Sequence, residues 1–399
     1  MNAFAVKKLA LLMAMTGMLG MHAHAQEKIK IGFITDMSSN YADVDGKNGA
    51  VAIQMAIDDF GGKVLGKPIE LLTQDHQHKP DIAATKAREW IDTQGLTMLL
   101  GGTNSGVALA LAKVANEKKR VYINNGAGTS SLTNDQCTPY TVHYAYDTVA
   151  LAKGTGAAVV ENGGKTWFFL TADYAFGQSL EADTAAVVKA KGGQVLGSVR
   201  HPLNASDFSS FLLQAQSSKA QILGLANAGG DTINAIKAAR EFGINKTMKM
   251  AGLLVFLTDI HSLGLKNTEG LLLTTSWDWN LNDETRAFGK KFMDKTKRMP
   301  TDVQAANYSA VTNYLKAVEK AGTTDADKVM TTLKSTPLKD FYGEGSIRPD
   351  GRYAHDMYLM QVKSPAESKA PWDYYKVVSK LSADQVWTTK AESKCALWK

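Results

Sequence analysis

Short apolar runs alternate with amphipathic stretches along most of the chain. The amphipathic stretches repeat the helical spacing i, i+3, i+4, i+7, as at Ile53, Ala56, Ile57 and Phe60. The apolar runs predict strands at 28–35, 68–74, 97–100, 120–124, 166–171, 194–199, 220–226, 248–255 and 270–276. Strands that alternate with helices indicate parallel sheets covered by helices on both faces.

This alternation occurs twice, at 28–146 and at 166–255, which predicts an α/β fold with two doubly wound parallel-sheet lobes. Later segments are helical (284–298, 301–321 and 326–335) and then extended again, so the chain should cross between the lobes three times. We expect an N-terminal lobe of residues 26–146 and 277–336 and a C-terminal lobe of residues 147–276 and 337–399. Such a three-crossing hinge permits closure on a ligand held between the lobes.

The first 25 residues have the pattern of a secretory signal peptide. Lys7 and Lys8 precede the uncharged apolar run 9–21, and Ala23-His24-Ala25 provides small residues around a cleavage site near Ala25. The apolar run is shorter than the roughly 20 residues of a membrane-spanning helix. We therefore expect an exported protein that begins at Gln26 and has no membrane anchor.

The charge and cysteine content of the chain argue against nucleic-acid binding and favour one disulfide. The 45 Lys and Arg against 39 Asp and Glu give a formal net charge of +6, and removal of Lys7 and Lys8 leaves 43 against 39, or +4. The basic residues are scattered, which argues against nucleic-acid binding. Cys137 and Cys395 are the only cysteines. An even number in an exported chain favours one disulfide over two buried free thiols.

Two polar loops follow neighbouring strands of the first lobe. One is Gly-Gly-Thr-Asn-Ser-Gly at 101–106, and the other is Asn-Asn-Gly-Ala-Gly-Thr-Ser-Ser at 124–131. Ordinary strand-to-helix turns use the same residues for turn geometry and helix capping. Two such loops in succession favour a binding site, because glycines allow close approach and a helix N-terminus suits a carboxylate.

Other chemistries have weaker patterns. His76 and His78 lie beside two aspartates, but a polar loop explains them and we expect no metal. Gly126 and Gly128 are followed by Ser131 in place of the third glycine of a dinucleotide motif, so we expect no cofactor. No nucleophile or metal set has convergent spacing, which disfavours an exported hydrolase and predicts no catalytic residues. A receptor sensor domain is disfavoured because neither a transmembrane segment nor an output domain follows Lys399.

Several stretches together resemble the leucine/isoleucine/valine-binding family of periplasmic substrate-binding proteins, which serve ABC importers. These stretches are 28–35, 59–62, 65–69, 101–105, 123–133 and 173–177. The resemblance extends over the whole mature chain. It implies a two-lobed periplasmic receptor that closes on a small molecule without catalysis and delivers it to an inner-membrane permease. We expect this receptor to be a monomer.

The resemblance also implies positions for the site. It places a ligand carboxylate against Ser105 and the loop from Gly126 to Gly128, with Tyr41 from the first lobe and Phe176 from the second lobe as cleft aromatics. Asn104 and Asn227 are candidates to bond ring hydroxyls or the acid. The candidate ligand-binding residues are Tyr41, Asn104, Ser105, Gly126, Ala127, Gly128, Thr129, Tyr174, Phe176, Asn227 and Trp277.

Two departures from the family pattern bear on the ligand. Gly128 stands where amino-acid-binding members carry a threonine. The acid that holds a substrate ammonium should follow the strand at 248–255, but the chain has Leu253-Leu-Val-Phe-Leu257 there, and Asp259 lies late. A buried ammonium without a partner is costly. We therefore expect a small, aromatic carboxylate, with a branched-chain amino acid and a short amide as alternatives.

Overall fold

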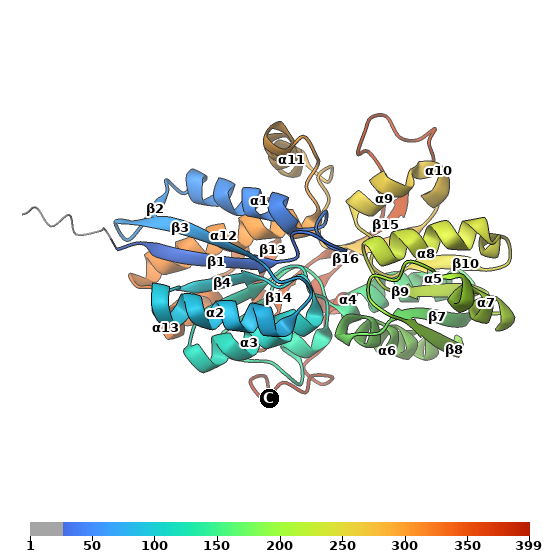
Figure 1. Cartoon of the computed structure of the whole chain (residues 1–399), viewed down its shortest axis with the longest axis horizontal. Helices are drawn as coiled ribbons and strands as arrows, with labels where there is room; N and C mark the ends of the chain where they lie inside the picture. Colours follow the sequence, from blue (N-terminus) through green and yellow to red (C-terminus); the bar gives the residue numbers. More distant parts are fainter. Residues whose placement is uncertain (1–26) are drawn as a thin grey trace, which may run out of the picture.

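The computed structural model describes residues 27–399, so the predicted signal peptide lies outside the described residues. The first lobe contains a six-stranded sheet with the order β2-β3-β1-β4-β5-β6 (Figure 1). All neighbouring strands are parallel except the short β2 against β3. The strands are β1 (Ile29–Thr35), β2 (Lys63–Val64), β3 (Lys67–Asp75), β4 (Met98–Gly101), β5 (Val121–Asn124) and β6 (Thr141–His143).

Alternating residues of these strands face different helices. Phe33 and Leu100 belong to the core under α1 (Gly46–Asp59) and α12 (Asp302–Ala321). Their neighbours Ile34 and Leu99 belong to the core under α2 (Pro80–Gln94) and α3 (Ser105–Lys118). The period of two along each strand thus buries both faces of the sheet, as the near-continuous apolar runs predict.

The second lobe repeats this design with the strand order β10-β9-β7-β8, all parallel. Trp167 and Phe169 face the side of α6, while Phe168 and Leu170 face α7 and α8. The strands are β7 (Thr166–Ala172), β8 (Gln194–His201), β9 (Ile222–Ala226) and β10 (Lys249–Gly252). The main helices are α6 (Ala175–Ala190), α7 (Ser209–Ser217) and α8 (Gly230–Glu241). The two lobes confirm the predicted fold class.

The remaining elements surround the lobes and the hinge. A continuous helical stretch opens the second lobe as α4 (Thr148–Leu151), the π-helical η2 (Ala152–Gly156) and α5 (Ala157–Glu161). The short helices are η1 (Ser130–Thr133), η3 (Ile244–Lys246), α9 (Leu257–Leu263), α10 (Leu265–Thr268) and α14 (Ala383–Val386). Within residues 27–399, no helix is long and apolar enough to span a membrane.

The chain crosses between the lobes three times. The crossings follow β6, then β11 (Leu272–Thr275) before α11 (Asp283–Thr296), and then β14 (Tyr353–His355) before β15 (Met357–Val362). β15 pairs with β11 on one side and with β16 (Tyr375–Leu381) on the other, in an antiparallel sheet.

The residues after Pro337 contact both lobes. β12 (Leu338–Lys339), β13 (Glu344–Ile347) and β14 form a small antiparallel sheet beside α13 (Ala326–Ser335). Asp340 accepts hydrogen bonds from Ser309 and Asn313 of α12, at 2.6 and 2.9 Å. We therefore propose to count 338–355 with the first lobe and β15 and β16 with the second, in place of assigning all of 337–399 to the second lobe.

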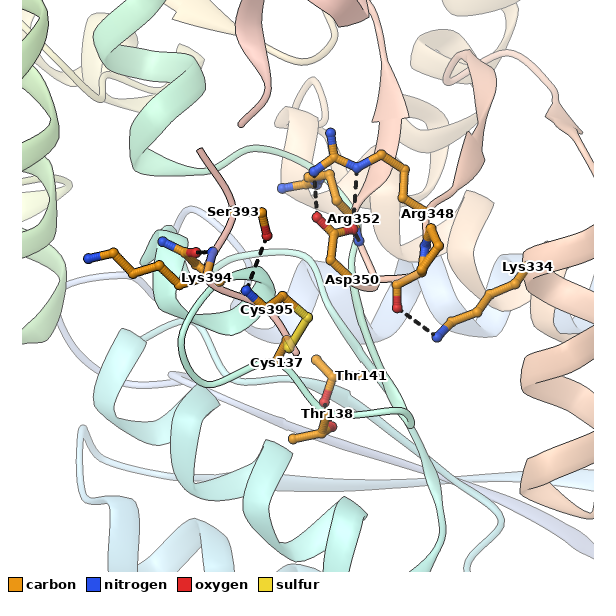
Figure 2. The surroundings of a disulfide bond; sticks show 12 residues. Cys137, Thr138, Thr141, Lys334, Arg348, Asp350, Arg352, Ser393, Lys394 and Cys395 are labelled. Carbon is orange, nitrogen blue, oxygen red and sulfur yellow. Dashed lines mark hydrogen bonds and ion pairs between the residues drawn. A yellow bond between two sulfur atoms is a disulfide. The ribbon is translucent and has the colours of Figure 1, made fainter. Parts of the chain in front are cut away.

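Cys137 and Cys395 form the predicted disulfide, which Figure 2 shows with its surroundings. Their Cα atoms are 5.7 Å apart although 258 positions separate them in the sequence. The Lys394 amide also donates to Asn134 Oδ1 at 2.5 Å, and the Arg348 guanidinium lies 4.0 Å from the centre of the Trp398 ring. The C-terminal tail therefore returns from β16 to the first lobe and adds a covalent link to the three crossings.

Candidate ligand-binding site

The candidate site lies where the strand order reverses in both lobes. β1 lies between β3 and β4 in the first lobe, and β7 lies between β8 and β9 in the second. Loops at the carboxyl ends of such strands form the usual ligand-binding crevice of open α/β sheets. Here the loops of the two lobes face each other across one cleft. Its lining residues are Tyr41, Thr103, Asn104, Ser105, Gly126, Ala127, Gly128, Tyr146, Tyr174, Phe176, Ala228, Leu254 and Phe256.

The cleft is narrow in this structure. Its atom-free space is about 240 Å³, and the centre of a water molecule can reach only about 10 Å³ of it. A cavity of that size holds roughly one water molecule. Grooves of about 690 and 730 Å³ are larger, but they lie outside the cleft and involve none of the loops at 101–106 and 126–129. We therefore place the candidate site in the narrow cleft, which has to widen to admit a ring.

The loop after β4 presents a helix N-terminus to the cleft. Gly101 and Gly102 have positive φ angles of 103° and 83°, which glycine adopts without steric cost. Asn104 caps α3 by accepting a hydrogen bond from the Val107 amide at 3.1 Å. Ser105 is the first residue of α3, and its Oγ accepts from the Thr129 amide at 3.2 Å. The Ser105 hydroxyl and the first amides of α3 can therefore donate hydrogen bonds to an anion.

The loop after β5 is held by its own buried side chains. Asn124 accepts from the Ala127 amide at 3.1 Å and donates to the Ala127 carbonyl at 2.8 Å. Tyr146 donates to the Gly126 carbonyl at 2.8 Å. Thr129 caps the short helix η1 by accepting from the Ser131 amide. These bonds order the backbone from Gly126 to Thr129 before any ligand arrives.

A buried polar network joins the loops after β1, β4 and β5. Thr35 and Thr103 donate to Asp45 Oδ2 at 2.7 and 2.6 Å, and Asn307 donates to Oδ1 at 2.7 Å. Asn125 in turn donates to Asn307 at 2.6 Å. Burial raises the pKa of Asp45 above its ordinary value, and the threonine and asparagine hydrogen bonds counteract part of that rise. The network fixes the three loops of the first lobe relative to α1 and α12.

Aromatic side chains form the walls of the cleft. The hydroxyls of Tyr41 and Tyr174, one from each lobe, are 2.6 Å apart. Phe176 lies against Gly128, where a Cβ atom would be 2.8 Å from the ring. The rings of Tyr146 and Phe256 are 6.1 Å apart. Burial raises the pKa of both Tyr41 and Tyr174, so their phenols stay neutral.

No charged side chain is among the residues that line this cleft. Behind Asn104, His78 Nε2 lies 2.9 Å from Asp36 Oδ2 and His78 Nδ1 lies 3.1 Å from the Asn104 side-chain amide. Asp259, the late acidic candidate, is buried at the start of α9 and accepts from the Phe256 amide at 2.9 Å. Its carboxylate therefore caps its own helix outside the cleft lining.

Eight of the eleven candidate residues line the cleft, and the other three are Thr129, Asn227 and Trp277. Thr129 reaches the site through its amide, which bonds Ser105. Asn227 and Trp277 do not line the cleft, in contrast to the sequence-based expectation. Asn227 bonds His201 at 3.1 Å and Thr232 at 2.7 Å, while Trp277 packs edge-on against Phe288 and donates to the Phe341 carbonyl at 3.1 Å.

Five lining residues were not among the candidates. They are Thr103, Tyr146, Ala228, Leu254 and Phe256. Each lies within a few positions of the carboxyl end of β4, β6, β9 or β10, which is the signal that could have identified them. The predicted strand at 248–255 ends at Gly252 in the structure. Leu254 and Phe256 are therefore apolar because they line the cleft, and they do not belong to a longer strand.

His76 and His78 lie close together, with ring centres 5.6 Å apart. Burial, and then the charge of His78, lower the pKa of His76 to about 4. Among residues 27–399, no group of three or more His, Cys, Asp or Glu side chains is arranged to hold a metal ion. The His78–Asp36 pair instead supports Asn104 at the start of α3.

Comparisons with known proteins agree on one family. The periplasmic binding protein family matches residues 28–369. A periplasmic binding protein from Burkholderia mallei is 67% identical, covering 94% of this chain and 100% of that chain, with a TM-score of 0.93. A branched-chain amino acid ABC transporter periplasmic ligand-binding protein from Burkholderia xenovorans LB400 is 41% identical, covering 93% and 100%, with a TM-score of 0.83.

A third similar structure contains a bound acid. It is the solute-binding protein of an ABC transporter from Rhodopseudomonas palustris BisB5 in complex with 3,4-dihydroxybenzoic acid. It is 25% identical to this chain, covers 90% of it and 98% of its own length, and has a TM-score of 0.80. With its two lobes and its cleft, this chain belongs to the periplasmic binding protein family, as an ABC-type substrate-binding protein of the branched-chain amino acid group.

Proposed function

We propose that this protein captures a small aromatic carboxylate between its lobes. The observation that supports this ligand is the composition of the cleft. Hydrogen-bond donors for an anion gather at Ser105, the start of α3 and the loop from Gly126 to Thr129, whereas the lining carries no acid to pair with an ammonium. The walls are neutral aromatic rings, which contribute about 0.5 to 1.5 kcal/mol beyond burial when they pack on another ring.

Contacts on both lobes would hold such a ligand. The carboxylate would accept from the Ser105 hydroxyl and from backbone amides, helped by the positive end of the α3 dipole. Tyr41 and Phe176 would cover the ring from opposite lobes, and the hydroxyls of Tyr41 and Tyr174 offer bonds to ring substituents. The Rhodopseudomonas palustris protein bound to 3,4-dihydroxybenzoic acid supports this ligand class.

A branched-chain amino acid is the second candidate. The Burkholderia xenovorans relative, described as part of a branched-chain amino acid transporter, favours it. It would require a partner for the α-ammonium, and the lining offers only hydroxyls, amides and carbonyls. A short amide is a third possibility. The proposal further includes cleavage near Ala25, a monomeric receptor, and delivery of the ligand to an inner-membrane permease.

A thermal-shift screen tests the ligand class. Ligands that bind the folded state raise the unfolding temperature according to occupancy and affinity. Benzoate, 4-hydroxybenzoate and phenylpropenoates should stabilise the protein, whereas leucine and valine should not. Stabilisation by leucine or valine alone would exclude the aromatic-acid proposal. Native mass spectrometry of protein purified without refolding provides a second measurement, since a retained molecule reports its own mass.

A further inference from the structure

Helix α8 of the second lobe begins without a cap of its own. Its N-cap position is Gly229, which has no side chain to accept a hydrogen bond from the first turn. The first amides of any helix lack intrahelical partners, and a side-chain acceptor usually serves them. In this helix the acceptor comes from the other lobe.

Asn40, in the loop after β1 of the first lobe, occupies that place. Its Oδ1 accepts from the Asp231 amide at 3.1 Å, the distance and partner of an ordinary helix cap. Its Nδ2 lies 3.4 Å from the Ala228 carbonyl and from Asp231 Oδ2, and its carbonyl lies 3.4 Å from the Gly230 amide. The side chain of Asn40 thus bonds Ala228 and Asp231 of the opposite lobe, and its backbone carbonyl adds the contact with Gly230.

The glycines at the start of α8 leave room for Asn40. A Cβ atom on Gly230 would lie 2.3 Å from Asn40 Oδ1, and the only other atom within 4 Å is Asn40 Cγ. The space around Gly230 is therefore limited by the first lobe and not by its own lobe. Separation of the lobes would remove both the crowding and the cap.

We propose that Asn40 is a positioning residue for ligand capture: it caps α8 across the cleft only when the lobes are closed, and so stabilises the closed state without touching the ligand. A contact made in one state alone shifts the equilibrium between two states toward that state. Asn40 should therefore raise affinity for any ligand that requires closure. The inference rests on closure of the cleft and not on the identity of the ligand.

Two single variants and their combination test this role. Asn40→Ala should raise the Kd for 4-hydroxybenzoate by up to about fivefold, the factor expected for loss of a typical cap, and the full factor applies when the ligand-free lobes are mostly open. Gly230→Ala should raise the Kd similarly while leaving the unfolding temperature of the ligand-free protein unchanged or higher, since alanine favours helix over glycine. The double variant should bind no more weakly than Asn40→Ala, because alanine at position 40 removes the obstruction. Additive losses in the double variant would overturn the proposal.

Hydrogen exchange provides a readout that needs no ligand. The Asp231 amide of the ligand-free protein should exchange faster in Asn40→Ala than in the wild type, by a factor that approaches five the more fully the ligand-free wild type is closed. Asp325→Ala is the matched control, because Asp325 caps α13 within one lobe by accepting from the Lys328 amide at 3.1 Å. It should lower stability without changing exchange at Asp231 or the Kd.

These measurements separate the two proposals. If 4-hydroxybenzoate fails to bind the wild type, the aromatic-acid proposal fails, and exchange at Asp231 alone decides the role of Asn40. Where 4-hydroxybenzoate binds, unchanged exchange in Asn40→Ala together with an unchanged Kd would reject that role. So would a Gly230→Ala variant that loses unfolding stability but keeps the wild-type Kd, because the contact would then be a fixed part of the fold.

Discussion

Ser105 combines two tasks at the residue scale. Its oxygen accepts from the Thr129 amide at 3.2 Å, which joins the loop after β5 to the start of α3. Its proton stays available to a ligand, because accepting that bond does not use it. The serine thus joins the two polar loops that the sequence singled out.

Replacing Ser105 by alanine should weaken binding of an aromatic acid by about 1.5 to 3 kcal/mol, as expected for a hydrogen bond to a charged group. Isothermal titration with 4-hydroxybenzoate measures this loss. Ser210→Ala, an exposed-surface control on α7 of the second lobe, should leave the affinity unchanged. An affinity that survives Ser105→Ala would remove the hydroxyl from the proposed carboxylate site.

Asp259 illustrates a titratable residue with a structural role. Burial raises its pKa from the ordinary value of 3.8 to about 7; the Phe256 hydrogen bond counteracts the rise, and Asp43 and Asp302 add to it. Between pH 3.8 and about pH 7, Asp259 is protonated in the folded protein and ionised in the unfolded chain. The Asp259 contribution to the unfolding free energy therefore falls as the pH rises from about 4 to about 7.

Asp259→Asn should remove that contribution, because an amide accepts from Phe256 without ionising. The variant should gain roughly 1 to 4 kcal/mol relative to the wild type between pH 4 and pH 7. Urea unfolding at both pH values measures the difference. A constant difference between the two proteins would show that Asp259 does not titrate in this range. Affinity for 4-hydroxybenzoate should not change, since Asp259 is outside the cleft lining.

At the scale of elements, α3 connects stability with binding. Its N-terminus faces the cleft, and Asn104 holds it through the Val107 amide while donating to His78. The sequence placed Asn104 beside the ligand. The structure shows that its side-chain oxygen is already used as a cap, so its effect on a ligand operates in part through the helix.

Asn104→Ala should lower the unfolding free energy by about 0.5 to 2 kcal/mol, as for loss of an N-cap, and should also weaken binding. Asn282→Ala is a matched control, because Asn282 caps α11 by accepting from the Thr285 amide at 2.9 Å, outside the cleft lining. Urea unfolding and titration with 4-hydroxybenzoate should show a stability loss in both variants but an affinity loss only in Asn104→Ala. Equal affinities would confine Asn104 to a capping role.

At the scale of the whole molecule, the tail and its disulfide supplement the hinge. The chain leaves the second lobe after β16, and Cys395 is then bonded to Cys137 of the first lobe. This closes a loop of most of the chain, which restricts the unfolded state strongly in the chain-entropy description.

Replacing both cysteines by alanine should lower the unfolding free energy by roughly 2 to 5 kcal/mol. Urea unfolding of the oxidised wild type and the double variant measures this loss. Thiol labelling of the unreduced, unfolded wild type should detect no free thiol, and two labelled cysteines would contradict the disulfide.

The sequence by itself determined the features that depend on local patterns. Apolar periodicity predicted most strands of the two parallel sheets and their alternation with helices, because burial on a sheet or helix repeats with a fixed period. The glycine-rich loops at 101–106 and 124–131 identified one side of the cleft, since turn and cap chemistry depends on neighbouring residues. The disulfide was also predicted correctly, because only two cysteines were present.

Only the tertiary structure decided which side chains reach the cleft. Asn227 and Trp277 follow strand ends as Ser105 does. Their side chains nevertheless hydrogen-bond His201 and the Phe341 carbonyl and do not line the cleft. Leu254 and Phe256 could be taken for strand residues until β10 ended at Gly252. The contact of Asn40 with Asp231 joins residues 191 positions apart. Such choices depend on packing between distant segments, and no local period or turn motif encodes them.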